Sequence, residues 1–264
     1  MEFVWRDEAP YGQGPGNGAV IVSSFPSAGL ATTVASHYIV RSLKLPRVGR
    51  FESPDLAPIA VVQSGEVNPT IRVYGRPGLG VVLSEFPPLP SHLTPIARTI
   101  LDTAERLQAR LLVCLEGVVP HPELDTTEGT TTAPIPDVPE NVWVAFSRHD
   151  PSVMTAFGQT QARALEDGVI GGVSGAMLVQ GLGRKVPVAV VLVSTRAAEG
   201  IPDHRAGAVL IETLDRLLPE LKIDTGPLRK QAVEIERMLR AAMKTRPAGP
   251  EPEAAQQSAT GMYG

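Results

Sequence analysis

GAVIVSSFPSAG occupies residues 18–29 and indicates a core strand that runs into a tight turn. The β-branched run Val20-Ile21-Val22 suits a pleated, buried sheet. Pro26 and Gly29 interrupt this run, and apolar residues then recur at helical spacing over residues 30–43. The first part of the chain is therefore predicted to form a strand, a tight turn and a helix.

The same alternation of apolar runs and helical patterns continues to residue 243. Further strands are predicted at 59–63, 70–74, 80–84, 111–115, 142–146 and 188–194. Further helices are predicted at 95–109, 173–182, 203–218 and 228–243. Apolar strands separated by helices are typical of a mostly parallel sheet covered on both faces. We therefore predict an α/β fold, a three-layer α/β/α sandwich, with one antiparallel hairpin around residues 74–78.

Composition divides the chain after residue 245. Residues 1–245 show no break that demands a second domain, so we expect a single α/β domain there. Residues 246–264 begin with a stretch rich in Pro, Ala, Gln, Ser and Thr, which cannot bury enough apolar surface to fold. We expect this segment to be a disordered tether. Residues 118–140, with many Pro, Thr and acidic residues, are expected to form a long surface loop of functional or mobile character.

The overall composition argues against several classes of protein. The chain has 264 residues, of which 43% are hydrophobic, and a formal net charge of -4, which disfavours a nucleic-acid binder. The sequence contains no run of about 18 apolar residues and its start does not resemble a secretion signal. Cys114 is the single cysteine, so no intrachain disulfide can form. We expect a cytoplasmic protein with neither a membrane nor a nucleic acid as its partner.

The turn after the first strand is a candidate anion-binding site. Small residues stand where a strand meets a helix N-terminus, in the group Phe25, Ser27, Ala28 and Gly29. Free N–H groups and the helix dipole favour a phosphate or carboxylate there. The plainer interpretation is that Gly29 permits the tight turn and Ser27 caps the helix. Both interpretations stay open.

Ser174 and its neighbouring glycines resemble a hydrolase nucleophile elbow. Residues 172–176 are one residue short of the Gly-x-Ser-x-Gly pattern, and Asp203 and His204 follow in the chain order of a catalytic triad. Adjacent residues on a helix point in different directions, so Asp203 and His204 cannot both serve one triad. We therefore favour a structural role for Ser174, in a tight turn or in helix packing, and a role for Asp203 as a helix N-cap.

Two other groups of polar residues have a structural and a functional interpretation. Three candidate metal ligands share the long loop: His121, Glu123 and Asp125. A solvated acidic loop explains them without a metal, so we assign no metal, cofactor or catalytic residue. Glu85 follows an apolar strand, where it is either a buried carboxylate near the first turn or the partner of Arg72 or Arg76 at the sheet edge.

The last predicted helix carries an apolar stripe. Its members recur at spacings of four and three: Leu228, Ala232, Ile235, Leu239 and Ala242. Such a stripe is typical of a helix that packs against another helix, which implies a homo-oligomer. The alternative is a single amphipathic helix that lies on its own domain.

Four stretches fall in the order expected of one family: residues 24–30, residues 52–58, the pair Ser84-Glu85, and residues 168–175. In this order they resemble the PAC2 family of proteasome assembly chaperones and their archaeal homologues, over residues 21–243. The resemblance implies a Rossmann-like fold distantly similar to nucleoside phosphorylases, self-association and no agreed enzymatic activity. The phosphorylase-like fold leaves one alternative open, a small-molecule binder or hydrolytic enzyme that uses the Phe25–Gly29 turn with Glu85 on nucleosides or phosphorylated ligands.

The sequence closes on Met262, Tyr263 and Gly264, which resemble the C-terminal docking motif of proteasome activators and assembly chaperones. The resemblance implies that Tyr263 and the Gly264 carboxylate enter pockets between α-subunits of the 20S proteasome, while Met262 adds apolar contact. The carboxylate exists only at a chain end, so residues added after Gly264 should abolish docking. We expect a non-catalytic proteasome assembly chaperone or an ATP-independent activator, and the sequence does not distinguish the two.

Overall fold

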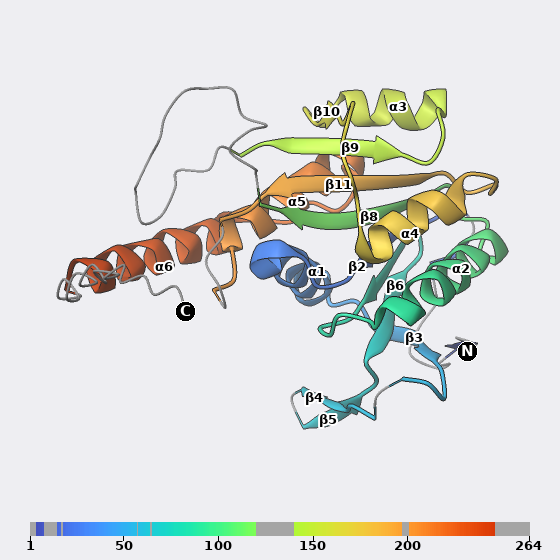
Figure 1. Ribbon diagram of the computed structural model, residues 1–264, viewed down its shortest axis with the longest axis horizontal. Coiled ribbons are helices and arrows are strands. Elements are labelled where there is room, and N and C mark those ends of the chain that lie inside the picture. The colour runs from blue at the N-terminus through green and yellow to red at the C-terminus, as the bar shows by residue number, and fades with distance from the viewer. Residues whose placement is uncertain are drawn as a thin grey trace, which may run out of the picture.

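A mixed β-sheet forms the centre of the molecule, shown as a computed structural model in Figure 1. The structure describes residues 4–7, 15–16, 18–56, 58–63, 65–119, 140–196 and 201–245. Within these ranges the sheet has nine strands: β1 (Val4–Asp7), β2 (Val20–Ser24), β3 (Arg47–Glu52), β6 (Ile71–Arg76), β7 (Leu79–Leu83), β8 (Leu111–Val118), β9 (Val142–Phe146), β10 (Arg163–Ala164) and β11 (Val188–Ser194). A separate two-stranded ribbon, β4 (Val61–Gln63) and β5 (Glu66–Asn68), projects from the body (Figure 1).

The middle of the sheet is parallel. The strand order is β1-β3-β6-β7-β2-β8-β11-β9-β10, and the neighbours from β7 through β2 and β8 to β11 all run parallel. On one side β6, β3 and β1 continue the sheet in antiparallel fashion. On the other side β9 is antiparallel to β11 and parallel to β10. The predicted hairpin around residues 74–78 is confirmed as the turn between β6 and β7.

Helices cover both faces of the sheet: α1 (Ala31–Ser42), α2 (Pro90–Arg106), α3 (Pro151–Gly158), α4 (Gly172–Gly181), α5 (His204–Leu217) and α6 (Gly226–Thr245). The helices α1 and α5 pack together on one face, and α2 and α4 pack together on the other (Figure 1). Successive strand residues point to opposite faces. Val113 of β8 therefore joins the core under α1 and α5, while Cys114 joins the core under α2 and α4. This arrangement confirms the predicted three-layer α/β fold.

Several elements differ from the predicted ones. The strand predicted at 59–63 lies in the projecting ribbon and not in the main sheet. The helix predicted from Pro95 begins at Pro90, because that proline takes the first helical position, where a missing N–H costs nothing. β3 was not predicted, since its buried Val48 and Phe51 stand among polar residues and give no continuous apolar run. Of the helices in the described ranges, none has the length and hydropathy that a bilayer crossing requires.

The short helix α3 was also missed, although its start signal is present. Asp150 accepts hydrogen bonds from the backbone N–H groups of Ser152 at 3.1 Å and Val153 at 3.3 Å. Pro151 occupies the first helical position. An aspartate followed by proline is a good helix N-terminus, but eight residues are too few for a clear helical period.

Candidate functional site

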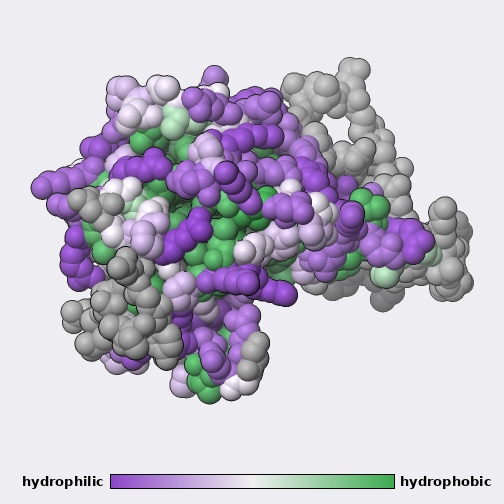
Figure 2. All heavy atoms as spheres, turned by 180° about the vertical axis from the view of Figure 1, so that it is seen from behind, coloured by the Kyte–Doolittle hydropathy of each residue, from purple (hydrophilic) through white to green (hydrophobic). Residues whose placement is uncertain are grey.

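α6 leaves the body as an arm (Figure 1). Leu228, in its first turns, is buried in the core that α5 also lines. Further along, the side chains of Val233 and Met238 are 66% and 60% exposed. Figure 2 shows apolar spheres beside polar ones on the part of the molecule that projects to the right. The arm therefore begins as part of the core and then presents apolar side chains to solvent.

The described residues of the apolar stripe predicted on α6 differ in their burial. Leu228 belongs to the core of its own chain, so it anchors the arm. Ala232 and Ile235 are half-buried. The side chains of Leu239 and Ala242 lie outside the described part of the chain, and the role of the stripe in self-association stays a prediction.

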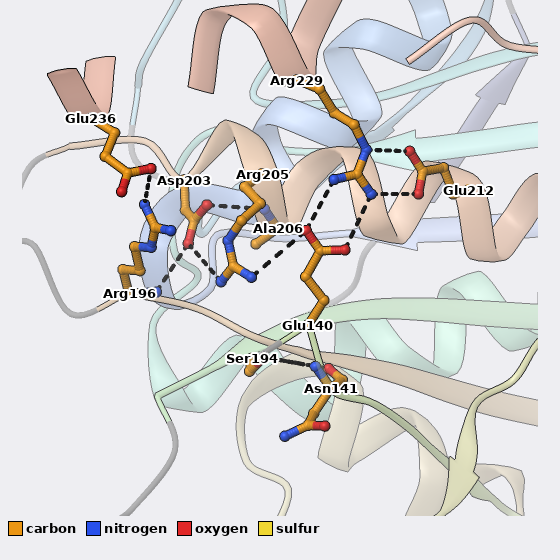
Figure 3. A network of polar contacts seen from close by, with 10 residues as sticks. All are labelled: Glu140, Asn141, Ser194, Arg196, Asp203, Arg205, Ala206, Glu212, Arg229 and Glu236. Atoms are coloured by element: carbon orange, nitrogen blue, oxygen red, sulfur yellow. Dashed lines mark hydrogen bonds and ion pairs between the residues drawn. The ribbon is translucent and has the colours of Figure 1, made fainter. Parts of the chain in front are cut away.

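An ionic cluster holds the base of α6 against the body (Figure 3). The guanidinium of Arg229 donates two hydrogen bonds of 2.7 Å to the two carboxylate oxygens of Glu212 on α5. It also donates to Glu140, just before β9, at 2.9 and 3.2 Å. These hydrogen bonds raise the pKa of Arg229 and, with a bond from Thr225, lower the pKa of Glu212. A planar guanidinium shared between two carboxylates fixes the direction in which α6 leaves the body.

Two more contacts hold α6 and the segment just before it against other elements. Arg196, after the end of β11, donates to Glu236 on α6 at 3.0 Å (Figure 3). The hydroxyl of Tyr38 on α1 donates to the carbonyl of Asp224 at 2.7 Å. The arm is thus held from α1, α5 and the end of a core strand.

Arg229→Met should loosen the arm. The substitution keeps an apolar stem of similar length but leaves Glu212 and Glu140 without their shared partner. Because Arg229 is 38% exposed, solvent screening limits the loss of stability to about 1–2 kcal/mol. Hydrogen exchange of residues 226–245 should become faster. Arg237→Met is the matched control, since Arg237 is 76% exposed and, among the described residues, pairs only with Glu234 on its own helix. Equal exchange in the two variants would contradict the anchoring role.

The Phe25–Gly29 turn packs tightly against β8 and the end of β11. Gly29 has a positive φ of 62°, and a Cβ atom there would lie 3.0 Å from Cβ of Thr195, which confirms its role in the turn. Ser27 makes no side-chain capping hydrogen bond, so the prediction that it caps the helix is wrong. Its hydroxyl accepts a hydrogen bond of 3.0 Å from the N–H of Gly117 and donates one of 3.2 Å to the hydroxyl of Thr32 on α1. Anion binding at this turn stays a prediction.

Glu85 pairs with Arg72, one of the two partners considered for it. Arg72 is fully buried and donates from β6 to Glu85, to the Tyr74 hydroxyl at 3.2 Å and to the Pro69 carbonyl at 3.1 Å. His37 Nε2 lies 2.8 Å from the same oxygen of Glu85. Burial opposes ionisation of Glu85, but the hydrogen bonds from His37 and Arg72 outweigh it and lower its pKa to about 2.

Ser174 is paired with a carboxylate and not with an imidazole. Its hydroxyl donates to Oε2 of Glu116 at 2.7 Å. Burial raises the pKa of Glu116 to about 7. Asp203 accepts from the N–H of Ala206 at 2.9 Å, which confirms the predicted N-cap of α5, and His204 is the first residue of that helix. The contacts of Ser174, Asp203 and His204 therefore agree with structural roles.

The remaining predicted residues lie outside the described ranges. These are the candidate metal ligands His121, Glu123 and Asp125 and the candidate docking residues Met262, Tyr263 and Gly264. Within the described ranges, no three His, Cys, Asp or Glu side chains are grouped to hold a metal ion.

Sequence reasoning missed both Glu116 and the Arg229 cluster. Glu116 had a signal, since it is a lone charge in an apolar strand. The partners of Arg229 had none, because Glu140 stands 89 positions away in the chain.

Comparisons with known proteins agree with this architecture. Residues 21–243 match the PAC2 family. An uncharacterised protein of Methanocaldococcus jannaschii is 23% identical over 221 residues, 84% of each chain. The crystal structure of Pyrococcus furiosus PbaA, titled an archaeal homologue of proteasome-assembly chaperone, is similar with a TM-score of 0.75 and 20% identity, over 92% of each chain. P. furiosus PbaB, titled an archaeal proteasome activator, has a TM-score of 0.70 and 17% identity, over 92% of this chain and 99% of its own. The chain belongs to the PAC2 family.

Proposed function

We propose that this protein is a non-catalytic partner of the 20S proteasome, acting as an assembly chaperone or as an ATP-independent activator. The observation that carries the proposal is membership of the PAC2 family over residues 21–243. The structural similarity to PbaA and PbaB over 92% of the chain supports the proposal, because PbaA is described as a homologue of proteasome-assembly chaperone and PbaB as a proteasome activator.

The docking element is the sequence Met262-Tyr263-Gly264. The Tyr263 ring fills a slot between α-subunits, the Gly264 carboxylate pairs with a lysine, and Met262 adds apolar contact. The α6 arm supports this assignment, because it leads away from the body and the segment before the motif follows it in the chain (Figure 1). If residues 246–261 behave as the flexible chain that their composition predicts, their root-mean-square reach is about 20–24 Å.

The chain acts as a homo-oligomer through α6. Val233 and Met238 are exposed there, and the half-buried Ala232 and Ile235 lie on the same helix. An apolar surface on a projecting helix is stabilised by packing against a second helix. Several docking motifs would then bind one α-ring together, and this avidity raises overall affinity by roughly 10²–10⁴.

Removal of the last three residues should abolish binding to the 20S proteasome. In the chain that ends at Gly264, Tyr263→Ala should weaken binding by roughly 30-fold or more, as expected when a central aromatic anchor is lost. Ser258→Ala, in the same segment, is the matched control and should bind as the unchanged chain does. Surface plasmon resonance on immobilised 20S particles measures all four proteins.

The outcomes separate the two roles and test the proposal. Faster peptide hydrolysis by the mature particle in the presence of the full chain would identify an activator. Binding with faster particle assembly but unchanged hydrolysis would identify a chaperone. Full binding by Tyr263→Ala would remove the docking motif from the proposal, and failure of the full chain to bind any 20S particle or assembly intermediate would refute the proteasome function itself.

A further inference from the structure

A cavity of about 340 Å³ opens beside the carboxyl ends of the parallel strands. It lies on the face covered by α2 and α4, and the carboxyl ends of the strands are where open α/β sheets bind their ligands. Its wall is mainly apolar and includes Phe25, Pro88, Leu93, Val118, Ile170 and Leu192. A small organic molecule with an apolar body fits such a wall.

The polar part of the cavity is the pair Glu116 and Ser174. Both residues line the cavity, and the Ser174 hydroxyl donates to Oε2 of Glu116 at 2.7 Å. Among the residues that the structure describes, none donates a hydrogen bond to the other carboxylate oxygen, Oε1. Oε1 of Glu116 is therefore free to accept a hydrogen bond from a ligand. The Ser174 hydroxyl can also accept one, because a hydroxyl that donates one hydrogen bond can still accept others.

The charge of Glu116 is not compensated by a basic side chain. No arginine, lysine or histidine is found among the described residues that line the cavity. Burial, partly offset by the Ser174 hydrogen bond, is the cause of the raised pKa of Glu116. A partly buried carboxylate without a cationic partner is costly, and a bound cation would relieve that cost.

The wall next to this pair is closely packed. A Cβ atom on Gly175 would lie 2.1 Å from the carbonyl oxygen of Ile170, so the first turn of α4 presses directly on the segment before it. Gly172 has a positive φ of 63°, which favours glycine at this bend. A wall packed this closely is already arranged for a ligand and loses little entropy on binding.

We propose that this cavity binds a small organic amine, with the protonated nitrogen on Glu116 and Ser174 and the hydrocarbon part against the apolar wall. A carboxylate or phosphate ligand is disfavoured by the charge of Glu116. A metal ion is disfavoured because the described residues that line the cavity supply one carboxylate and one hydroxyl side chain, fewer ligands than metal sites use. The proposal is independent of proteasome docking, which uses other residues.

The test compares three ligands of similar size that differ in charge: 2-phenylethylamine, 2-phenylethanol and 3-phenylpropionate. Isothermal titration calorimetry with the full chain at pH 8 measures affinity. The amine should bind at least about tenfold more tightly than the alcohol, and the acid should not bind. At ten times its dissociation constant, the amine should raise Tm by about 3–5 °C.

Variants identify the residues that are responsible. Glu116→Gln should lower amine affinity at least about tenfold and make amine and alcohol equivalent. Ser174→Ala removes the hydroxyl oxygen and should lower amine affinity about threefold or more. This second variant keeps the proposal testable if Glu116→Gln fails to fold. Glu220→Gln, a carboxylate outside the cavity lining, is the matched control and should bind the amine unchanged.

Affinity for the amine should also depend on pH. Ionised Glu116 is needed to pair with a cation, and its pKa of about 7 predicts about tenfold tighter binding at pH 8 than at pH 6. Burial and the nearby Glu116 raise the pKa of Cys114, so its thiol stays neutral at both values. Equal affinity for amine and alcohol, full amine binding by Glu116→Gln, or no binding of millimolar amine would each overturn the proposal.

Discussion

Gly117→Ala is expected to destabilise the protein by roughly 3 kcal/mol. A Cβ atom at this position would lie 2.4 Å from the backbone oxygen of Ala28 and 2.9 Å from Cγ2 of Thr195. The turn before α1 crosses β8 here, and the N–H of Gly117 donates to Ser27. A backbone oxygen cannot rotate away as a flexible side chain would, so the turn must shift and this hydrogen bond must weaken. Calorimetry should show a decrease in Tm of about 6–12 °C.

Gly158→Ala is the matched control for this experiment. Gly158 is the last residue of α3, and a Cβ atom there would meet no atom within 4 Å. The substitution should leave stability unchanged or raise it by up to about 1 kcal/mol, because alanine loses less backbone entropy than glycine on folding. Equal stability of the two variants would show that the turn yields easily and that its contact with β8 is not a rigid part of the fold.

Arg72→Ala is expected to cost about 3–5 kcal/mol, as when one partner of a buried ion pair is removed. The Arg72 side chain is fully buried and holds Glu85, the Tyr74 hydroxyl and a backbone carbonyl together. Without it, the contacted oxygen of Glu85 keeps only His37, and the other carboxylate oxygen is already buried with no hydrogen-bond partner among the described residues. Urea denaturation at pH 7 measures the loss.

The double variant Arg72→Met, Glu85→Gln distinguishes charge from packing. It removes both charges and refills most of the volume, so it should be markedly more stable than Arg72→Ala. If Arg72→Ala lost less than about 1 kcal/mol, the ion pair would not be a main support of β6 and β7.

The ion pair of Arg72 and Glu85 also predicts how the stability of the fold depends on pH. The folded-state pKa of Glu85 is lowered from 4.5 to about 2, so its contribution is present above pH 4.5 and is lost as the pH falls toward 2. This contribution is roughly 3 kcal/mol. Glu85→Gln should therefore show a smaller loss of stability between pH 5 and pH 2 than the unchanged chain. Glu66→Gln removes an exposed carboxylate and controls for the change in net charge. An unchanged acid dependence in Glu85→Gln would contradict the role of the pair.

The central strands and most helices could be predicted because their signals are local. Residues 142–146 and 188–194 form strands with the predicted boundaries, since each is an apolar run bounded by turn residues. β3 was not recognised, because a strand whose buried residues stand among polar ones resembles a polar segment with scattered apolar residues. The ribbon of β4 and β5 is the opposite case. The strand predicted at 59–63 does form, but within the described ranges it pairs only with its neighbour β5 and is not part of the main sheet.

The polar sites were less predictable than the fold. Arg72 and Glu85 were recognised as candidates because Glu85 follows the strand that a short turn joins to the strand of Arg72, and the two residues are only 13 positions apart. Glu116 and Ser174 are 58 positions apart, and Arg229 and Glu212 are 17 apart on different helices. No periodicity connects such pairs, so neither could be found from the sequence.

The sequence by itself determined the strand, turn and helix of residues 18–43, the order of α and β elements and the PAC2 resemblance, and it carries the proposed docking motif. These properties reside in short segments whose backbone preferences and side-chain patterns act over a few residues. Only the tertiary structure decided that the Ser27 hydroxyl accepts from the N–H of Gly117 on β8 and caps no backbone N–H of the helix after it, and that Glu116 faces a cavity. Burial and hydrogen-bond partners depend on which distant segments the folded chain brings together. A pattern of a few neighbouring residues does not specify those long-range contacts.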